Sequence, residues 1–301
     1  MVDWANIALL STAIIGLVNI IDSHLISRRM PGLQAFLLPA SLTILVVSLV
    51  AASLFPLPSG LDGQTLLIAV LSGILRTFSL GILLFTFKME EVSRVIPVYS
   101  TFPVFVAIMA VPLLGEAVGL LQWLAIIVVV AGAVVVSANR SPGSATRRLG
   151  RVFVLLLISS LLMAGANIAS KYVLDSISSW NMYWITGLSI AAGFMLVSLR
   201  PRVVRELAGL RQRGVVLGLL AFNELLVVAG VVLLFVAMQN GPVSLVSAIF
   251  SSRPIFVLIF AFAISRTFPN FLKWETGKGV LAQRVVGTAM VVAGITAIYL
   301  S

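Results

Sequence analysis

Residues 92–105, VSRVIPVYSTFPVF, recur in altered form at residues 243–256, VSLVSAIFSSRPIF. The two stretches share Val, Ser and Pro residues in the same order when the chain is shifted by 151 positions. The Ser and Pro matches carry the comparison, because Val matches are common in apolar sequence. Two further matches follow: Asn19-Ile20 with Asn167-Ile168, and Val129–Gly132 with Val291–Gly294. The chain is therefore predicted to contain two copies of one unit.

Apolar segments dominate the whole chain. Hydrophobic residues make up 60% of it and charged residues only 10%. Apolar runs recur about ten times, and about 20 helical residues cross a hydrocarbon layer of about 30 Å. We therefore predict an all-α polytopic membrane protein with ten transmembrane helices. The predicted spans are 4–27, 33–55, 64–87, 91–114, 117–138, 152–174, 179–199, 214–239, 242–265 and 284–300.

Lysine and arginine residues gather in alternate loops of this predicted topology. The loops after the first, third, fifth, seventh and ninth helices hold nearly all of them, and the other loops and both tails hold none. Because loops rich in Lys and Arg face the cytoplasm, both termini are predicted to be extracytoplasmic. The net charge of +10 is then an orientation signal in the cytoplasmic (inner) membrane, and no nucleic-acid partner is expected.

Each copy contains five predicted helices, which is an odd number, so the second copy enters the membrane from the opposite face. We assign residues 1–139 to the first repeat, 140–151 to a cytoplasmic linker and 152–301 to the second repeat. Inverted repeats are typical of secondary transporters, in which two halves enclose a midplane site and rock about it. The repeat therefore favours transport by alternating access.

The segment from Phe85 to Ser137 resembles the EamA repeat of the drug/metabolite transporter superfamily. The residues that carry the resemblance are Val92-Ser93, Pro103-Val104-Phe105-Val106, Leu114-Gly115-Glu116, Gln122-Trp123 and Ala131-Gly132. The resemblance extends over both halves, although Ile264-Ser265-Arg266 replaces Leu-Gly-Glu in the second half and the loop after it is longer. It implies a ten-helix transporter of small metabolites, with export as the expected direction, and it fixes no substrate.

Three charged residues fall at membrane depth: Arg76, Glu224 and Arg253. Along their predicted helices they lie within about 3 Å of one level near the bilayer centre. A charge there costs about 2.5–3.5 kcal/mol on insertion scales, so each needs an explanation. One alternative is a salt bridge between Glu224 and either arginine. The other arginine then has no carboxylate partner. The other is that a central arginine binds an anionic group of the solute, most simply a carboxylate, through paired hydrogen bonds.

Other polar residues of the spans complete the predicted site. Besides Arg253 and Arg76, the candidate solute contacts are Asn19, Asn167, Tyr99, Asn223 and Ser251. The candidate coupling or gating groups are Glu224, His24, Asp22 and Lys171. Structural alternatives stay open for several of them. The asparagines can form interhelical hydrogen bonds, His24 and Asp22 can lie at the membrane interface, and Lys171 can extend its amine to the membrane surface.

The composition limits the metal sites, cofactors and energy sources that the protein can use. The chain has no Cys and a single His, and neither a metal site nor a cofactor is predicted. No GxxxxGKS/T loop occurs, so ATP is not the expected energy source. We predict a secondary transporter or facilitator of small solutes that are amino-acid-like, anionic or amphipathic. Its expected partners are the lipid bilayer and protons, and a monomer is a sufficient unit. The alternatives are a passive channel or structural membrane protein, and an intramembrane lipid-modifying enzyme.

Overall fold

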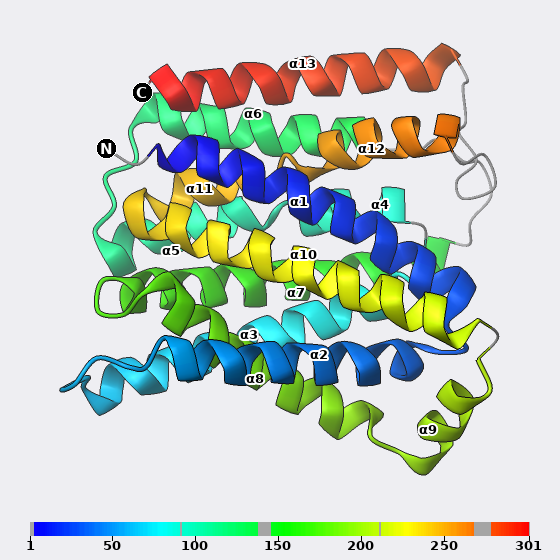
Figure 1. Ribbon diagram of the computed structural model, residues 1–301. Coiled ribbons are helices and arrows are strands. Elements are labelled where there is room, and N and C mark those ends of the chain that lie inside the picture. The colour runs from blue at the N-terminus through cyan, green and yellow to red at the C-terminus, as the bar shows by residue number, and fades with distance from the viewer. Residues whose placement is uncertain (1–2, 91, 138–145, 211, 268–277, 301) are drawn as a thin grey trace.

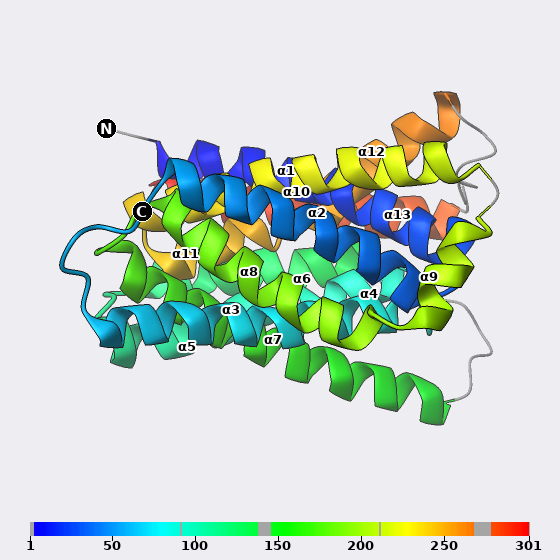
Figure 2. The same ribbon diagram turned by 60° about the horizontal axis from the view of Figure 1, so that its bottom comes forward.

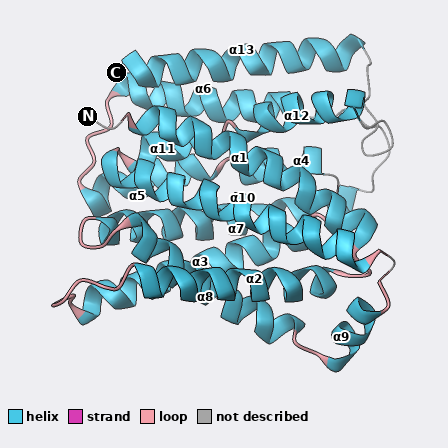
Figure 3. Cartoon of the chain, viewed as in Figure 1, coloured by secondary structure: helices cyan, strands magenta, loops and turns pink. Residues whose placement is uncertain are grey.

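The computed structural model describes residues 3–90, 92–137, 146–210, 212–267 and 278–300 (Figure 1). Helices account for nearly all of these residues, and no strand occurs among them (Figure 3). The helices are α1 (Trp4–His24), η1 (Leu25–Arg29), α2 (Leu33–Leu54), α3 (Gly63–Thr86), α4 (Val92–Tyr99), α5 (Phe102–Leu114), α6 (Leu120–Ser137), α7 (Thr146–Leu174), α8 (Ser179–Ser198), α9 (Pro201–Ala208), α10 (Arg213–Asn240), α11 (Val243–Phe250), α12 (Arg253–Thr267) and α13 (Lys278–Leu300). The predicted turn at Ser141-Pro142-Gly143 and the first half of the predicted linker 140–151 lie outside the described residues.

Helix length and composition fit a membrane environment. Within the described part of the chain, seven helical segments are long and apolar enough to cross a bilayer. Three shorter apolar helices, at 102–114, 120–135 and 285–298, accompany them. The observed α2, α3 and α8 agree with the predicted spans to within one residue at each end. The architecture therefore agrees with the predicted all-α polytopic membrane fold.

The predicted helices 91–114 and 242–265 are wrong as continuous segments, because each is broken near its middle. In the first copy α4 ends at Tyr99 and α5 begins at Phe102, and in the second α11 ends at Phe250 and α12 begins at Arg253. A proline follows the first residue of each later helix. Proline has no N–H to continue the ladder of hydrogen bonds from the preceding turn, and its ring clashes with the carbonyl four residues earlier.

Both breaks use the same backbone hydrogen bond. The N–H of Thr101 donates to the carbonyl of Val98 at 3.2 Å, and the N–H of Ser252 donates to the carbonyl of Ile249 at 3.0 Å. Both bonds join a residue to the third one before it, which tightens the chain into a 3₁₀-like turn at the end of the helix. Equivalent positions of the two copies therefore share one local conformation, as the repeat predicts.

Three other boundaries differ from prediction. The first helix continues beyond residue 27 through the π-helical turn η1, which closes with a bond from the N–H of Met30 to the carbonyl of Leu25 (2.8 Å). Helix α7 begins at Thr146, within the predicted linker. Helix α9 lies where the sequence predicts a loop. This short basic segment is helical because Val203 on one face of it is buried against α2.

The helices form one bundle in which contacts join elements far apart in sequence (Figure 2). Helix α13 packs along α6, α3 packs against α7 and α8, and α1 packs against α10 and α12. Equivalent glycines lie in the α6–α13 contact. A Cβ at Gly132 would lie 2.8 Å from the carbonyl oxygen of Gly287, and one at Gly294 would lie 2.6 Å from Val129 Cγ2. Only glycine permits such close approach of the two helices.

Charge separates the two ends of the bundle. Both termini lie at the same end, and α9 lies at the opposite end (Figure 1). Helix α9 carries Arg202 and Arg205, and it shares a cavity with Arg28 and Arg29 at the end of η1. We call these the terminal end and the basic end. Arginines that follow the first and the seventh predicted helices thus lie at one end of the bundle.

Candidate solute-binding site

Arg76 of α3 is buried among side chains from two other helices, α7 and α10. Its side chain is 5% exposed. One terminal nitrogen, Nη2, donates to Asn167 Oδ1 at 2.9 Å, and Nη1 lies 3.6 Å from Met163 Sδ. The guanidinium also lies over the ring of Phe235, 5.2 Å from its centroid. Asn167 continues the network, since its Nδ2 donates to Ser247 Oγ at 3.4 Å. A polar chain thus runs from α3 through α7 to the broken segment of the second copy.

Arg253 is the first residue of α12, and it is 3% exposed. Three aromatic rings surround its guanidinium. The centroids of Phe250, Tyr99 and Phe102 lie 4.4, 5.2 and 5.9 Å from its Cζ atom. Its Nε donates to the carbonyl of Phe250 at 3.1 Å. The aromatic rings are the favourable, weakly polar partners of a cation that has no carboxylate beside it.

Tyr99 joins the two arginines into one cluster. The centroid of its ring lies 5.2 Å from the Cζ atom of Arg253, and its side chain lies near the Arg76 guanidinium. Its backbone carbonyl accepts a hydrogen bond from Ser160 Oγ of α7 at 3.1 Å, which ties the end of α4 to the wall of the site. The structure therefore brings together four of the predicted solute contacts. We call Arg76, Asn167, Tyr99 and Arg253 the arginine cluster.

The cluster has hydrogen-bond donors without acceptors. Arg76 Nε and Arg253 Nη2 are buried and unpaired. Neither arginine forms a salt bridge with Glu224 or with any other carboxylate of the described residues. The salt-bridge alternative considered for the sequence is therefore absent from this conformation. A buried, charged donor without an acceptor costs free energy, about 1–3 kcal/mol or more, which a bound anion would recover.

A second polar cluster lies between α1 and α10. Asn223 Nδ2 donates to Asp22 Oδ1 at 2.7 Å, and Asn223 Oδ1 is buried and unpaired. Glu224, 5% exposed, lies near Asp22 and near Tyr183 of α8. We call Asp22, Asn223 and Glu224 the acidic cluster. Among the described residues no hydrogen bond or ion pair connects it to the arginine cluster.

The other predicted residues occupy separate positions. Asn19 is buried and its Nδ2 is unpaired. Ser251 Oγ donates to the carbonyl of Ala248 at 2.7 Å, within its own helical turn. His24 accepts a hydrogen bond from Arg29 Nε at 3.2 Å near the basic end. Lys171 Nζ donates to the carbonyl of Met238 at 2.8 Å. Ser251, His24 and Lys171 therefore have protein partners outside the arginine cluster.

The sequence analysis missed the role of Glu116. Its Oε1 accepts from the N–H of Val243 at 2.6 Å, and its Oε2 accepts from the N–H and the hydroxyl of Ser244 at 3.3 and 2.5 Å. The carboxylate thereby caps the first turn of α11. Gly115 precedes it with φ 67°, a left-handed conformation that ends α5 and turns the chain toward α11. The Leu114-Gly115-Glu116 motif contained the signal, but its partner lies more than 120 residues away.

Two of the three aromatic residues around Arg253 were also missed. Phe102 and Phe250 are buried, and each lies beside a break that the sequence did not predict. The repeat contained a usable signal, since Tyr99 and Phe250 occupy equivalent positions and so do Phe102 and Arg253. Three aromatic residues and one arginine at corresponding sites of two copies indicate that the copies meet there.

A duplicated helical unit with broken helices around buried charges defines a multi-pass membrane transporter. Residues 4–138 and 151–300 each match the EamA-like transporter family. The chain therefore belongs to the EamA-like transporter family, within the drug/metabolite transporter superfamily, and is a membrane transporter of small solutes. No curated protein matches the sequence.

Solved structures share the fold. Among the 25 solved chains that match is a crystal structure described only as that of a protein, which superposes with a TM-score of 0.68. It is 15% identical to this sequence, and the match covers 99% of this chain and 95% of the other. At this level of identity the comparison shows a common architecture.

Proposed function

We propose that the protein is a secondary transporter or facilitator that moves a small carboxylate-bearing metabolite, such as an amino-acid-like solute, outward across the cytoplasmic membrane. One observation carries the proposal. Two arginines are buried, both lie near Tyr99, each has an unpaired N–H group, and neither is paired with a carboxylate of the described residues. A solute carboxylate is the simplest group that accepts from both guanidinium groups.

The position of Arg253 adds to the attraction for an anion. It begins α12, where unsatisfied backbone N–H groups and the helix dipole favour negative charge. An arginine in that place adds positive charge to positive potential, which is unfavourable in an empty site. A bound carboxylate reverses the sign of this interaction. The rings of Tyr99, Phe102 and Phe250 exclude water around the same group, which strengthens the electrostatic contact.

The architecture that we propose has ten membrane spans in two inverted five-helix repeats, residues 1–139 and 152–301. Each pair of broken helices, α4–α5 and α11–α12, counts as one span. Equivalent breaks in the two copies support the repeat, and the odd number of spans in each copy supports its inversion. The basic end then faces the cytoplasm and both termini are extracytoplasmic. Rocking of the two repeats about the arginine cluster would give alternating access.

The acidic cluster is our candidate for proton coupling. Asp22 and Glu224 lie close enough to interact, and Asn223 bonds one of them. Two carboxylates in a membrane interior share a low-dielectric space, in which two negative charges repel each other strongly. Gain of one proton removes this repulsion, and loss of the proton restores it. Glu224→Gln should abolish dependence of transport on a pH gradient. If the variant transports with unchanged proton dependence, the coupling group lies elsewhere or the protein is a facilitator.

A thermal-shift screen of the purified protein against small metabolites tests the site. Solutes that bind the folded state raise its melting temperature by mass action. We expect carboxylate-bearing solutes to stabilise the wild type and not Arg253→Gln, while saturable counterflow in liposomes follows the same order. Arg205→Gln, an exposed charge change at the basic end, is the matched control. Retention of carboxylate binding by a folded Arg253→Gln protein would remove Arg253 from the site, and uptake that does not saturate for any solute would favour a channel.

A further inference from the structure

The acidic cluster has hydrogen-bond acceptors without donors, which is the reverse of the arginine cluster. Glu224 is 5% exposed, and no hydrogen bond or ion pair within the described ranges reaches its carboxylate. Asn223 is fully buried, and its Oδ1 has no donor although its Nδ2 donates to Asp22 Oδ1. Both atoms belong to one amide group, so the unpaired oxygen lies beside the Asp22 carboxylate. The cluster therefore presents two carboxylates and an amide oxygen to any ligand.

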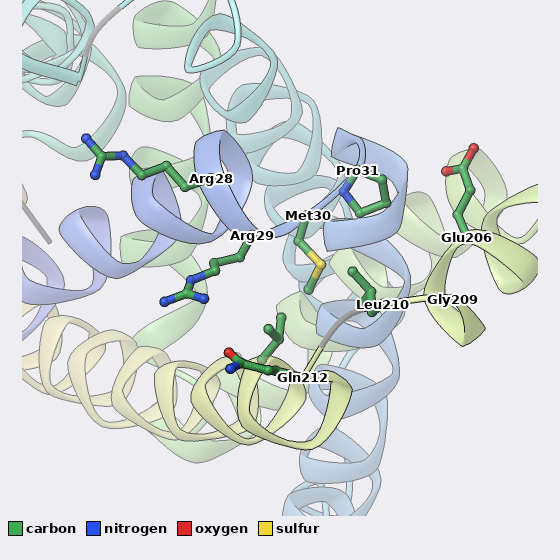
Figure 4. Close-up of a pocket in the computed structure, with 9 residues that line it drawn as sticks. Arg28, Arg29, Met30, Pro31, Glu206, Gly209, Leu210 and Gln212 are labelled. Atoms are coloured by element: carbon green, nitrogen blue, oxygen red, sulfur yellow. The ribbon is translucent and has the colours of Figure 1, made fainter. Parts of the chain in front are cut away.

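No cationic side chain of the described residues forms an ion pair with Asp22 or Glu224. The arginines nearest to Asp22 in sequence are Arg28 and Arg29, which line the cavity at the basic end (Figure 4). Arg29 Nε donates to His24 Nε2 at 3.2 Å. Two negative charges in a membrane interior are costly when no positive charge is paired with them. A ligand that supplies positive charge and N–H donors would offset this cost.

Helix α1 connects the acidic cluster to the helix that begins with Arg253. Gly16 packs on the start of α12, where a Cβ would lie 2.9 Å from Phe256 Cβ and 3.6 Å from the carbonyl oxygen of Arg253. Asn19 lies about one turn further along α1, and Asp22 lies about one turn beyond it, at about 9 Å from the level of Gly16. Asn19 is buried, and its Nδ2 is unpaired. The same helix therefore borders both clusters, with an unpaired amide between them.

The number of acceptors distinguishes among the cations that could bind here. A primary ammonium group has three N–H donors and no acceptor, which matches the two carboxylates and the Asn223 oxygen. A proton binds one carboxylate and leaves Asn223 Oδ1 without a donor. A metal ion such as Ca²⁺ takes about six to eight oxygen ligands, which is more than the cluster presents. The arrangement therefore fits an ammonium group best.

We propose that the acidic cluster binds a protonated amine of the solute whose carboxylate lies at the arginine cluster. The transported solute then carries both groups, separated by a chain of several carbons. This inference rests on the proposed function for the carboxylate end and adds the amine end. It is compatible with proton coupling, because a proton and an ammonium group each neutralise the same carboxylates.

Three solutes with the same chain of five carbons test the proposal. δ-Aminovalerate carries both charged groups, valerate carries only the carboxylate, and pentylamine carries only the amine. Thermal-shift titration of the full-length protein in detergent gives the dissociation constant of each. We expect the wild type to bind δ-aminovalerate about 10- to 100-fold more tightly than valerate, the range expected for hydrogen bonds to a charged group.

The variants locate the origin of this preference. Glu224→Gln should remove the advantage of δ-aminovalerate and leave the affinity for valerate unchanged. Asp22→Asn, a second variant of nearly the same shape, should do the same, and the melting temperature without solute shows whether each variant is folded. Glu206→Gln is the matched control, because it removes a carboxylate at the basic end, and it should keep the preference.

Failure of the amine site can be told apart from failure of the carboxylate site. If the wild type binds δ-aminovalerate no better than valerate, or if folded Glu224→Gln keeps the preference, the amine proposal is overturned and the carboxylate site stands. If Arg253→Gln binds valerate as well as the wild type does, the carboxylate site fails, whereas binding of pentylamine that depends on Glu224 still supports the amine site. Equal stabilisation by sodium ions that depends on Glu224 would reject the amine in favour of small cations in general.

Discussion

The two broken segments, residues 99–103 and 250–254, differ at one position that changes their chemistry. Both contain an aromatic residue, a serine and a proline at equivalent places, and both break with the same backbone bond. The first segment has Phe102 where the second has Arg253. Tyr99 and Phe102 of the first segment lie around Arg253 together with Phe250 of its own segment, so the apolar copy forms part of the wall around the charged residue. The two copies therefore share the backbone conformation of the break, and the difference between Phe102 and Arg253 places a positive charge in only one of them.

The turns that follow the two broken helices differ as well. After α5, Glu116 caps the first turn of α11 with three hydrogen bonds. In the second copy Arg266 replaces the glutamate in the sequence match; it lies in the last turn of α12, and its guanidinium lies over the ring of Phe262 at 4.8 Å. An arginine has donors only and cannot cap a helix N-terminus. The terminal end of the bundle therefore has a tie between the repeats that the equivalent residue at the basic end cannot form.

Making the second segment resemble the first should have the largest effect. Arg253→Phe removes the charge but retains an apolar ring among Tyr99, Phe102 and Phe250. We expect the affinity for a carboxylate solute to fall about 10- to 100-fold, since hydrogen bonds to charged groups contribute about 1.5–3 kcal/mol each. Phe102→Leu is the control, and it should weaken binding far less. Titration of the solute by thermal shift or by counterflow measures both, and similar losses in the two variants would mean that shape rather than charge determines binding.

Removing the tie at Glu116 should have the next largest effect. Glu116→Gln replaces a charged acceptor of three hydrogen bonds by a neutral amide that accepts fewer of them, and we expect a loss of about 1–2 kcal/mol of stability. Ser244→Ala removes one of the three bonds and should cost less. Thermal unfolding in detergent gives both values. If Arg266→Gln lowers the melting temperature as much as Glu116→Gln does, Glu116 does not stabilise the bundle more than the residue that replaces it in the second copy.

The equivalent asparagines offer a smaller contrast. Asn167 bonds Arg76 and Ser247, whereas Asn19 Nδ2 is unpaired. Asn167→Leu should therefore destabilise the empty protein by about 1–3 kcal/mol, because Arg76 loses its acceptor. Asn19→Leu should leave the empty protein nearly unchanged and should lower solute affinity if the free amide contacts solute. Unfolding with and without solute separates the two effects, and a destabilised Asn19→Leu protein would contradict the difference.

Much of the fold could be predicted because the membrane restricts the choices. Every backbone group must be satisfied inside a span, so a long apolar run is a helix, and residues 33–54, 63–86 and 179–198 agree with prediction. The breaks at Ser100 and Ser251 could not be predicted. A proline such as Pro103 or Pro254 is compatible with a kinked continuous helix as well as with two separate ones.

The candidate site was predicted in its polar members and missed in its surroundings. Arg76 and Arg253 were conspicuous because a charge is costly at membrane depth. Their lack of a carboxylate partner depends on how α3, α10 and α12 pack, which the sequence does not contain. The same holds for Glu116, whose partners Val243 and Ser244 lie in the other repeat. The free-energy cost of burying a charged residue can be judged from that residue alone. The group that offsets this cost lies elsewhere in the chain, so it is found only once the packing is known.

The smallest expected effect concerns the serines of the two breaks. Ser251 Oγ donates to the carbonyl of Ala248 at 2.7 Å, whereas Ser100 Oγ is buried and unpaired. Ser251→Ala should lower the stability by about 0.5–1.5 kcal/mol, and Ser100→Ala should leave it unchanged or raise it slightly, because the unpaired hydroxyl gains nothing from burial. The measurement is a paired thermal unfolding series without solute. If solute then stabilises Ser100→Ala less than the wild type, the unpaired hydroxyl of the apolar segment belongs to the binding site, and the two segments share the work of holding the solute.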